Sequence, residues 1–199
     1  MAELALAYHD DPNIDPDDWF EIIEGEKIMA ASAKSGHNIV AGRIFSEFDR
    51  FFISRSIIAL AILDCDVYLP DGNIFRPDLC IVSDLTLIGK DGKVHGVPDL
   101  CVEVLSPSTM KNDLGIKKVL YEKYGVKEYW IIDQLSCNIY THMLDGDHYR
   151  LNEACHFYNQ TELEALTDKE RSEIKDKIQV GIYPELSIDL KYIFRSLFN

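Results

Sequence analysis

The sequence predicts a mixed α/β fold, and three patterns lead to this prediction. An apolar strand signal over residues 98–105 is followed by a helix signal over 113–124 and a second strand signal over 127–133. A strand, helix and strand in this order most often close a parallel pair. A helical pattern over 35–54, and hairpin signals on both sides of this unit, add further helices and antiparallel strands.

Length and composition fit one globular domain over residues 19–199, with a surface arm before it. The chain has 199 residues, of which 47% are hydrophobic and 27% are charged, enough to bury a sizeable core. Residues 1–18 are acidic and rich in Asp and Pro, without an apolar period. The apolar run 57–63 is too short to span a bilayer and the N-terminus lacks signal-peptide features, so we expect a cytoplasmic protein.

The first half of the domain reads as a hairpin, a helix and a pair of strands. Residues 19–29 alternate apolar and polar side chains around Glu24-Gly25, which predicts a hairpin. From Ser35 to Ser54 apolar residues recur every three or four positions, which predicts an amphipathic helix capped by Ser35. Residues 57–69 and 77–82 are predicted strands on either side of a turn at 71–73.

In the second half, the strand at 98–105 carries a run of apolar residues (Leu100, Cys101, Val102, Val104 and Leu105) interrupted by Glu103, which predicts burial on both faces. Asn112 is predicted to cap the helix over 113–124, and Gly125 to end it in a left-handed conformation. Residues 137–143 and 148–152 predict a second hairpin around 145–147. Capping-box matches at Thr161-x-x-Glu164 and Thr167-x-x-Glu170 precede a final strand near 182–188 and a terminal helix.

Two carboxylates, Asp78 and Glu103, interrupt apolar strands. An ionised carboxylate buried without partners costs several kcal/mol, so two of them suggest a metal site. If the two strands are neighbours, both acids can point to the same end of the sheet. Hard divalent cations such as magnesium take one or two carboxylates together with water and phosphate.

Residues 103 and 105 share one face of the strand, but position 105 is a leucine and offers no charge beside Glu103. The nearest basic side chains are on the following helix, where Asp113, Lys117 and Tyr121 are spaced by four and share a face. An ammonium from Lys117 would orient an attacking water and offset charge on a phosphoryl group, while a metal activates the water. This chemistry is phosphodiester hydrolysis.

The chain resembles the Uma-type restriction endonucleases of the PD-(D/E)xK nuclease superfamily over roughly residues 19–145. The residues that carry the resemblance are Glu21 to Gly25, His37, Asp66-Val67, Pro77-Asp78, PDLCVE at 98–103, LSPST at 105–109, Asp113, Lys117, Tyr121 and EYWIID at 128–133. The resemblance implies a restriction-endonuclease-like core, with a mixed central sheet flanked by helices, and a magnesium or manganese requirement.

By this resemblance, Asp78 and Glu103 would be the catalytic acids that bind the metal. Lys117 would supply the catalytic lysine from the helix, because Leu105 occupies the usual strand position. Four residues are secondary candidates: Glu21, His37, Asp66 and Tyr121. A cleaving enzyme of this kind would act on DNA, and cutting both strands needs two sites, which favours a homodimer.

Each of these residues also has a structural explanation. Asp78 would cap backbone amides at a strand start, Glu103 would form a salt bridge with Arg76 or Lys117, and Lys117 would be a solvated helix residue. His37, Glu21, Asp66 and Tyr121 would pack or pair locally.

The net charge of −14 opposes DNA binding, although residues 107–130 carry five lysines against three acids. Two other functions therefore stay open. One is an inactive nuclease-fold binding module, and the other is a hydrolase of a smaller phosphoester.

Overall fold

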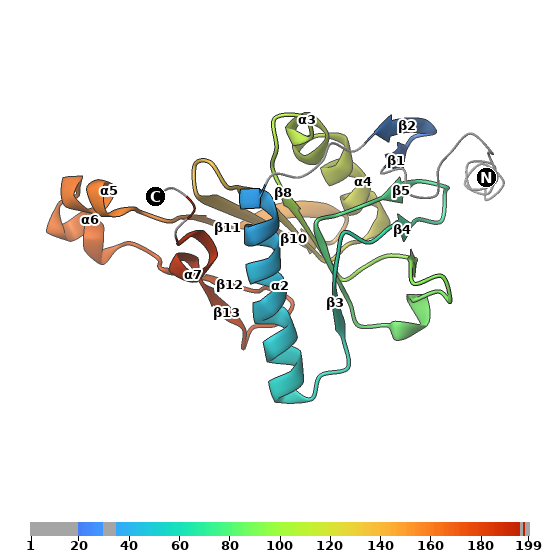
Figure 1. Ribbon diagram of the computed structural model, residues 1–199, viewed down its shortest axis with the longest axis horizontal. Helices are drawn as coiled ribbons and strands as arrows, with labels where there is room; N and C mark the ends of the chain where they lie inside the picture. The colour runs from blue at the N-terminus through green and yellow to red at the C-terminus, as the bar shows by residue number, and fades with distance from the viewer. Residues whose placement is uncertain (1–19, 30–34, 196, 198–199) are drawn as a thin grey trace.

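The computed structural model describes residues 20–29, 35–195 and 197. The acidic arm predicted over residues 1–18 lies outside this part of the chain, as does Trp19. The predicted single domain over 19–199 stays a prediction. The fold is a mixed α/β fold in which helices flank mixed sheets, as predicted (Figure 1). None of the helices in the described ranges is both long and apolar enough to cross a membrane.

A six-stranded sheet forms the centre of the molecule. Its strands, in spatial order, are β11 (His148–His156), β10 (Asn138–Asp145), β9 (Glu128–Asp133), β8 (Leu100–Val104), β6 (Leu79–Val82) and β3 (Leu60–Leu63). The pair β8 and β9 is parallel, with Glu103 opposite Ile131, and the other neighbours are antiparallel. The predicted parallel pair around the connecting helices is therefore confirmed.

One face of this sheet is covered by α2 (Ser35–Arg55), which crosses in front of it in Figure 1. The apolar stripe of α2, including Val40, Ile44 and Phe48, packs on Leu100 and Trp130 of the sheet. A C-terminal unit completes this layer: β12 (Lys177–Gln179), β13 (Ser187–Asp189) and α7 (Leu190–Phe194).

The opposite face is covered by α4 (Ile116–Tyr124) and by a smaller sheet. That sheet has the order β2 (Glu26–Met29), β1 (Phe20–Ile23), β5 (Ile74–Phe75), β4 (Val67–Tyr68) and β7 (Val94–His95). Its apolar side chains form a second core cluster with Leu120 and Tyr121 of α4 and with Cys101 and Leu105 of the central region. Because β8 is buried against both layers, its acid Glu103 is enclosed.

Two elements differ from the sequence prediction where the chain changes direction. The strand predicted over 57–69 is divided into β3 and β4, because Asp64 between them has a left-handed φ of 48°. The helix predicted over 113–124 is divided into α3 (Met110–Leu114) and α4, with Gly115 between them. Asn112 consequently lies inside α3 and does not cap the helix. Gly125 ends α4 with φ 85°, as predicted.

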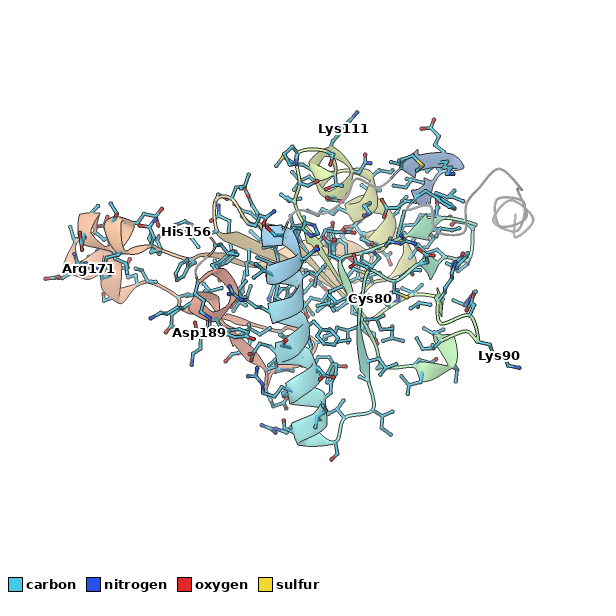
Figure 2. The ribbon with its side chains drawn as sticks, in the orientation of Figure 1. Cys80, Lys90, Lys111, His156, Arg171 and Asp189 are labelled. Carbon is cyan, nitrogen blue, oxygen red and sulfur yellow. The ribbon has the colours of Figure 1, made fainter. Side chains whose placement is uncertain are left out.

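The remaining segments lie at the periphery. Helices α5 (Gln160–Ala165) and α6 (Asp168–Ser172) project from one side of the molecule, where Arg171 and His156 are labelled in Figure 2. The capping box of α6 is Thr167 with Glu170, as predicted, but that of α5 is Asn159 with Glu162, two residues earlier than expected. A short 3-10 helix, η1 (Leu85–Leu87), precedes β7. All five cysteines are free thiols.

Candidate active site

Glu103 lies in β8 and is almost completely buried, with 3% of the residue exposed. Strand alternation directs it to the face that α4 covers. Lys117 Nζ lies 2.7 Å from its Oε1, and the Tyr121 hydroxyl donates a 3.0 Å hydrogen bond to the same oxygen. Of the two salt-bridge partners that the sequence left open, the partner present is Lys117. Position 105 of the strand carries no positive charge, and the ammonium that contacts Glu103 comes instead from Lys117 on the helix.

Lys117 is buried on α4 and contacts two further carboxylates. Its Nζ lies 2.8 Å from Glu21 Oε1 on β1 and 3.4 Å from Asp113 Oδ1 on α3. We call Glu21, Glu103, Asp113 and Lys117 the Lys117 cluster. Because its acids come from β1, β8 and α3, the cluster joins the small sheet, the central sheet and the helices at one point.

The electrostatics of the Lys117 cluster keep its ammonium charged. Burial disfavours the charge, but Glu103, Glu21 and Asp113 outweigh burial and hold the pKa of Lys117 well above its usual value. Burial also raises the pKa of Glu103 well above its usual value and raises that of Asp113, while Lys117 opposes both shifts. One positive charge thus faces three acids in a desolvated site. Such a site favours binding of a proton or a further cation.

Asp78 follows Pro77 and directly precedes β6. Its Oδ2 accepts a 2.6 Å hydrogen bond from the backbone N–H of Val104 and lies 3.1 Å from His37 Nε2. Since Val104 follows Glu103 in β8, this bond holds the Asp78 carboxylate beside the strand position of Glu103. The two acids also interact electrostatically, because Asp78 contributes to the raised pKa of Glu103, which burial mainly causes.

His37 lies near the start of α2 and is buried against Asp78. Burial lowers its pKa, but the hydrogen bond and charge of Asp78 overcome this, and the pKa of His37 is raised. The imidazole therefore carries positive charge more readily than a solvated histidine. His37 fixes Asp78 from the α2 side, as Lys117 fixes Glu103 from the α4 side.

Asp66 lies just before β4 in a separate ion-pair network. Its Oδ1 lies 2.6 Å from Arg76 Nη2 and 2.7 Å from Arg76 Nε, and its Oδ2 lies 3.0 Å from Lys93 Nζ. The backbone N–H of Arg76 donates a 2.8 Å bond to Glu21, which links this network to the Lys117 cluster. Asp66 therefore supports Glu21 through Arg76.

The structure thus brings together most of the residues that the sequence singled out. Glu103, Lys117, Tyr121 and Glu21 are in direct contact, and Asp78 and His37 form the adjoining pair. Within the described ranges, the ion-pair partner of Asp78 is His37, so Lys117 does not reach both acids. A cavity of about 600 Å³ lies elsewhere, lined by residues of α5, α6 and α7, and it contains none of these acids.

The sequence matches a known protein family. The Uma2 family model, described as "Putative restriction endonuclease", matches residues 5–173. This chain belongs to the Uma2 family. No sequence among the curated proteins matches it.

The fold of this Uma2-family chain is shared with a solved structure. The crystal structure of "a putative nuclease belonging to DUF820" from Anabaena variabilis superposes with a TM-score of 0.68 at 18% identity. The match covers 96% of each chain. At this identity the likeness establishes the fold alone, and the roles of individual residues rest on the site described above.

The site residues predicted from the sequence of this Uma2-family chain leave out one acid of the Lys117 cluster, Asp113. Asp113 was placed on the helix face of Lys117 but was not a candidate, although its spacing of four from Lys117 signals contact. Glu128 is fully buried in β9 and accepts hydrogen bonds from Trp130 Nε1 at 2.7 Å and from the amides of Gly181 at 3.0 Å and Ile182 at 2.9 Å. Glu128 is thus a structural acid, whereas Glu103 pairs with a cation.

Proposed function

We propose that this protein hydrolyses phosphodiester bonds with the help of a divalent metal ion, and that DNA is its substrate. The observation that carries this proposal is the buried Lys117 ammonium, 2.7 Å from Glu103, beside the Asp78 carboxylate that the Val104 amide holds. The family's description as a restriction endonuclease supports a nuclease. Asp78, Glu103 and Lys117 are the proposed catalytic residues.

Asp78 and Glu103 are the residues that would hold the metal ion. Within the described part of the chain no group of three or more His, Cys, Asp or Glu side chains is arranged as a complete metal cage. Magnesium and manganese do not need such a cage, because they keep several waters and take oxygen ligands from one or two carboxylates and a phosphate. The two-carboxylate donor set fits this requirement. When bound, the ion would lower the pKa of a water and polarise the phosphate.

Lys117 acts in this proposal as a fixed positive charge. Because its carboxylate neighbours keep its pKa well above the usual value despite burial, it does not remove a proton from water. Its N–H groups would orient the attacking water, and its charge would offset the charge that develops on the phosphoryl oxygens. Tyr121 and His37 are positioning residues that fix Glu103 and Asp78 through their hydrogen bonds.

The surface charge bears on the choice of substrate. Three of the five lysines between residues 107 and 130 are already paired: Lys117 is buried, Lys123 lies 3.4 Å from Asp71, and Lys127 lies 2.6 Å from Asp99. The net charge of the whole chain, −14, opposes the phosphate contacts that supply most non-specific DNA affinity. A smaller phosphoester is therefore the second candidate substrate, served by the same residues.

The test is hydrolysis of supercoiled plasmid and of bis(p-nitrophenyl) phosphate, each with magnesium, manganese or EDTA. We expect metal-dependent nicking, and losses on the order of 10²-fold or more for the near-isosteric changes Asp78→Asn and Glu103→Gln. Lys123→Gln, on the exposed side of α4, is the matched control and should keep its activity. Hydrolysis of the small ester without nicking would select the second candidate.

Calorimetry separates metal binding from catalysis. Asp78→Ala should weaken magnesium or manganese binding relative to the wild type. Equal binding by both proteins, or none by either, would remove Asp78 from the metal site. Retained hydrolysis in the Asp78→Asn and Glu103→Gln variants would contradict the catalytic assignment as a whole.

A further inference from the structure

Three of the five cysteines lie in the core between the central sheet and the α4 layer. Cys65, Cys80 and Cys101 belong to the apolar cluster on that face, while Cys137 and Cys155 pack on the α2 face. Cys80 in β6, labelled in Figure 2, and Cys101 in β8 expose none of their surface. The proposed hydrolysis uses none of these thiols.

Cys80 and Cys101 are direct neighbours across two strands. In the antiparallel pairing of β6 with β8, they are residues that lie opposite each other. Opposite residues direct their side chains to the same face of a sheet, so the two thiols lie beside each other on the α4 face. Cys65 lies between β3 and β4, outside the strand pairing. The register of the sheet thus selects one pair of thiols from the three.

The backbone hydrogen bonds show which kind of cross-strand pair this is. The amide of Leu105 donates to the carbonyl of Ile132 in β9 at 2.8 Å, and strand alternation then turns the backbone groups of Cys101 toward β9 as well. The carbonyl of Asp78 accepts a 3.3 Å bond from the β3 side, which likewise turns the backbone groups of Cys80 toward β3. The two cysteines therefore form a pair without hydrogen bonds between them.

This kind of pair has the spacing that a disulfide needs. The Cα atoms of a non-hydrogen-bonded antiparallel pair are about 4.5 Å apart. Disulfides join cysteines whose Cα atoms are about 4.4–6.8 Å apart, with both side chains directed to the same side. Cys80 and Cys101 meet both conditions, so a bond between their sulfur atoms needs no movement of the strands.

We propose that Cys80 and Cys101 are an oxidation site, at which hydrogen peroxide joins the two thiols in a disulfide. Peroxide takes two electrons from one thiol, which becomes a sulfenic acid, and one water is released. The sulfur of the second thiol then attacks the sulfenic sulfur. The S–S bond forms as the S–O bond breaks, and the departing oxygen takes the proton of the second thiol and leaves as another water.

Burial determines how fast this bond forms and how long it lasts. Hydrogen peroxide is little larger than water and reaches the core through small local openings of the fold. Thiol reductants such as glutathione are bulkier, and attack on a disulfide requires access to one of its sulfur atoms. We therefore expect slow oxidation, over hours, and a product that persists in the folded protein until unfolding exposes it to a reductant.

The bond would join the two strands that lead to the candidate site. Cys80 follows Asp78 by two residues, and Cys101 precedes Glu103 by two. A link between them would fix β6 to β8 and restrict the unfolded chain, which raises stability. The inference does not depend on the proposed activity, because it rests on the strand register and the backbone hydrogen bonds.

Peptide mapping by mass spectrometry tests the proposal on the full-length protein. The folded protein is treated with hydrogen peroxide, unfolded, blocked with iodoacetamide and digested without reductant. We expect the intact protein to lose the mass of two hydrogen atoms and the digest to contain a cross-linked peptide that joins Cys80 to Cys101. Its melting temperature should rise by about 5 °C or more, and unfolding with dithiothreitol should reverse both changes.

Two alanine variants provide the comparison. Cys101→Ala removes one partner, so peroxide should give neither the cross-link nor the rise in melting temperature. Cys65→Ala, in the same core cluster, is the matched control and should form the bond as the wild type does. Circular dichroism verifies that each variant is folded, and the wild-type map is decisive without them. A wild-type digest that lacks the cross-link, or in which Cys65 is cross-linked to Cys80 or Cys101, would overturn the proposal.

Discussion

Two buried glutamates show how the same residue type takes different roles. Glu103 lies inside the apolar strand β8, Glu128 is the first residue of β9, and both are almost fully buried. Glu128 is satisfied by an indole and two backbone amides, whereas Glu103 is satisfied by an ammonium and a phenol. Backbone donors fix a carboxylate permanently, while a cation and a hydroxyl leave it able to exchange partners. Glu103 is therefore the acid suited to a reaction.

At the residue scale, removing the Lys117 charge should destabilise the protein. Lys117→Met leaves Glu21, Glu103 and Asp113 without their shared cation, and breaking a buried ion pair costs about 3–5 kcal/mol. Urea unfolding measures the loss. The exposed control Lys123→Met, whose partner Asp71 is 3.4 Å away, should lose about 1 kcal/mol or less.

The same variant should depend on pH in a defined direction. Burial raises the pKa of Glu103 and of Asp113, so the folded state binds protons more tightly than the unfolded state. Such acids increase the free energy of unfolding at low pH, and this contribution is lost as the pH rises through their folded-state pKa. Without the opposing charge of Lys117, the free energy of unfolding of Lys117→Met should fall more steeply from pH 5 to pH 8 than that of the wild type. A parallel pair of pH profiles would contradict this prediction.

At the scale of elements, the interruption between α3 and α4 shapes the site. Gly115 has φ −109° and ψ −104°, and an added Cβ would lie 2.7 Å from the backbone oxygen of Lys111. A side chain at this position must displace α3. Because Asp113 belongs to α3 and Lys117 to α4, the interruption sets how the two residues meet.

Gly115→Ala should therefore lower both stability and activity. We expect a loss of about 1–3 kcal/mol from the backbone clash, and a lower kcat as Asp113 moves relative to Lys117. Gly42→Ala in α2 is the matched control, because nothing lies within 4 Å of the added Cβ and alanine favours a helix by about 1 kcal/mol. In thermal unfolding, Gly115→Ala should melt below the wild type and Gly42→Ala above it. Melting temperatures shifted in the same direction in both variants would show that the close contact with the Lys111 oxygen does not determine the effect at Gly115.

At the scale of the whole molecule, a packing layer covers each face of the central sheet, and the two layers differ in their polar content. On one face, α2 and the C-terminal unit pack against the sheet and form one continuous apolar core. The α4 layer encloses the Lys117 cluster between apolar residues. Glu128 joins the C-terminal unit to β9 through Gly181 and Ile182, on the face of the sheet opposite the Lys117 cluster.

Loss of the Glu128 carboxylate should loosen the C-terminal unit and leave the site intact. Glu128→Ala removes the acceptor for three buried donors, at a cost of about 3 kcal/mol or more. Hydrogen exchange should increase over residues 177–190 first. Metal binding at 10 °C, where the variant remains folded, should match the wild type. Unchanged exchange over this segment would refute the anchoring role of Glu128.

The sequence by itself determined the fold class and predicted the members of the candidate site except Asp113. Periodicity located α2, β8, β9 and the β10–β11 hairpin, because these elements are long and their apolar patterns are strong. Charge inside apolar strands singled out Asp78 and Glu103, since a buried acid needs a partner. Helical spacing placed Lys117 and Tyr121 on one face.

Only the tertiary structure decided which partner each acid has. The contact of Lys117 with Glu21 joins segments far apart in the chain, and no local pattern encodes such a contact. Asp78 pairs with His37 and Asp66 with Arg76 and Lys93 for the same reason. For Glu103 the sequence left Arg76 and Lys117 open, and the structure pairs it with Lys117. The breaks at Asp64 and Gly115 were also missed, because backbone direction there follows from packing of the two layers, which local propensity does not contain.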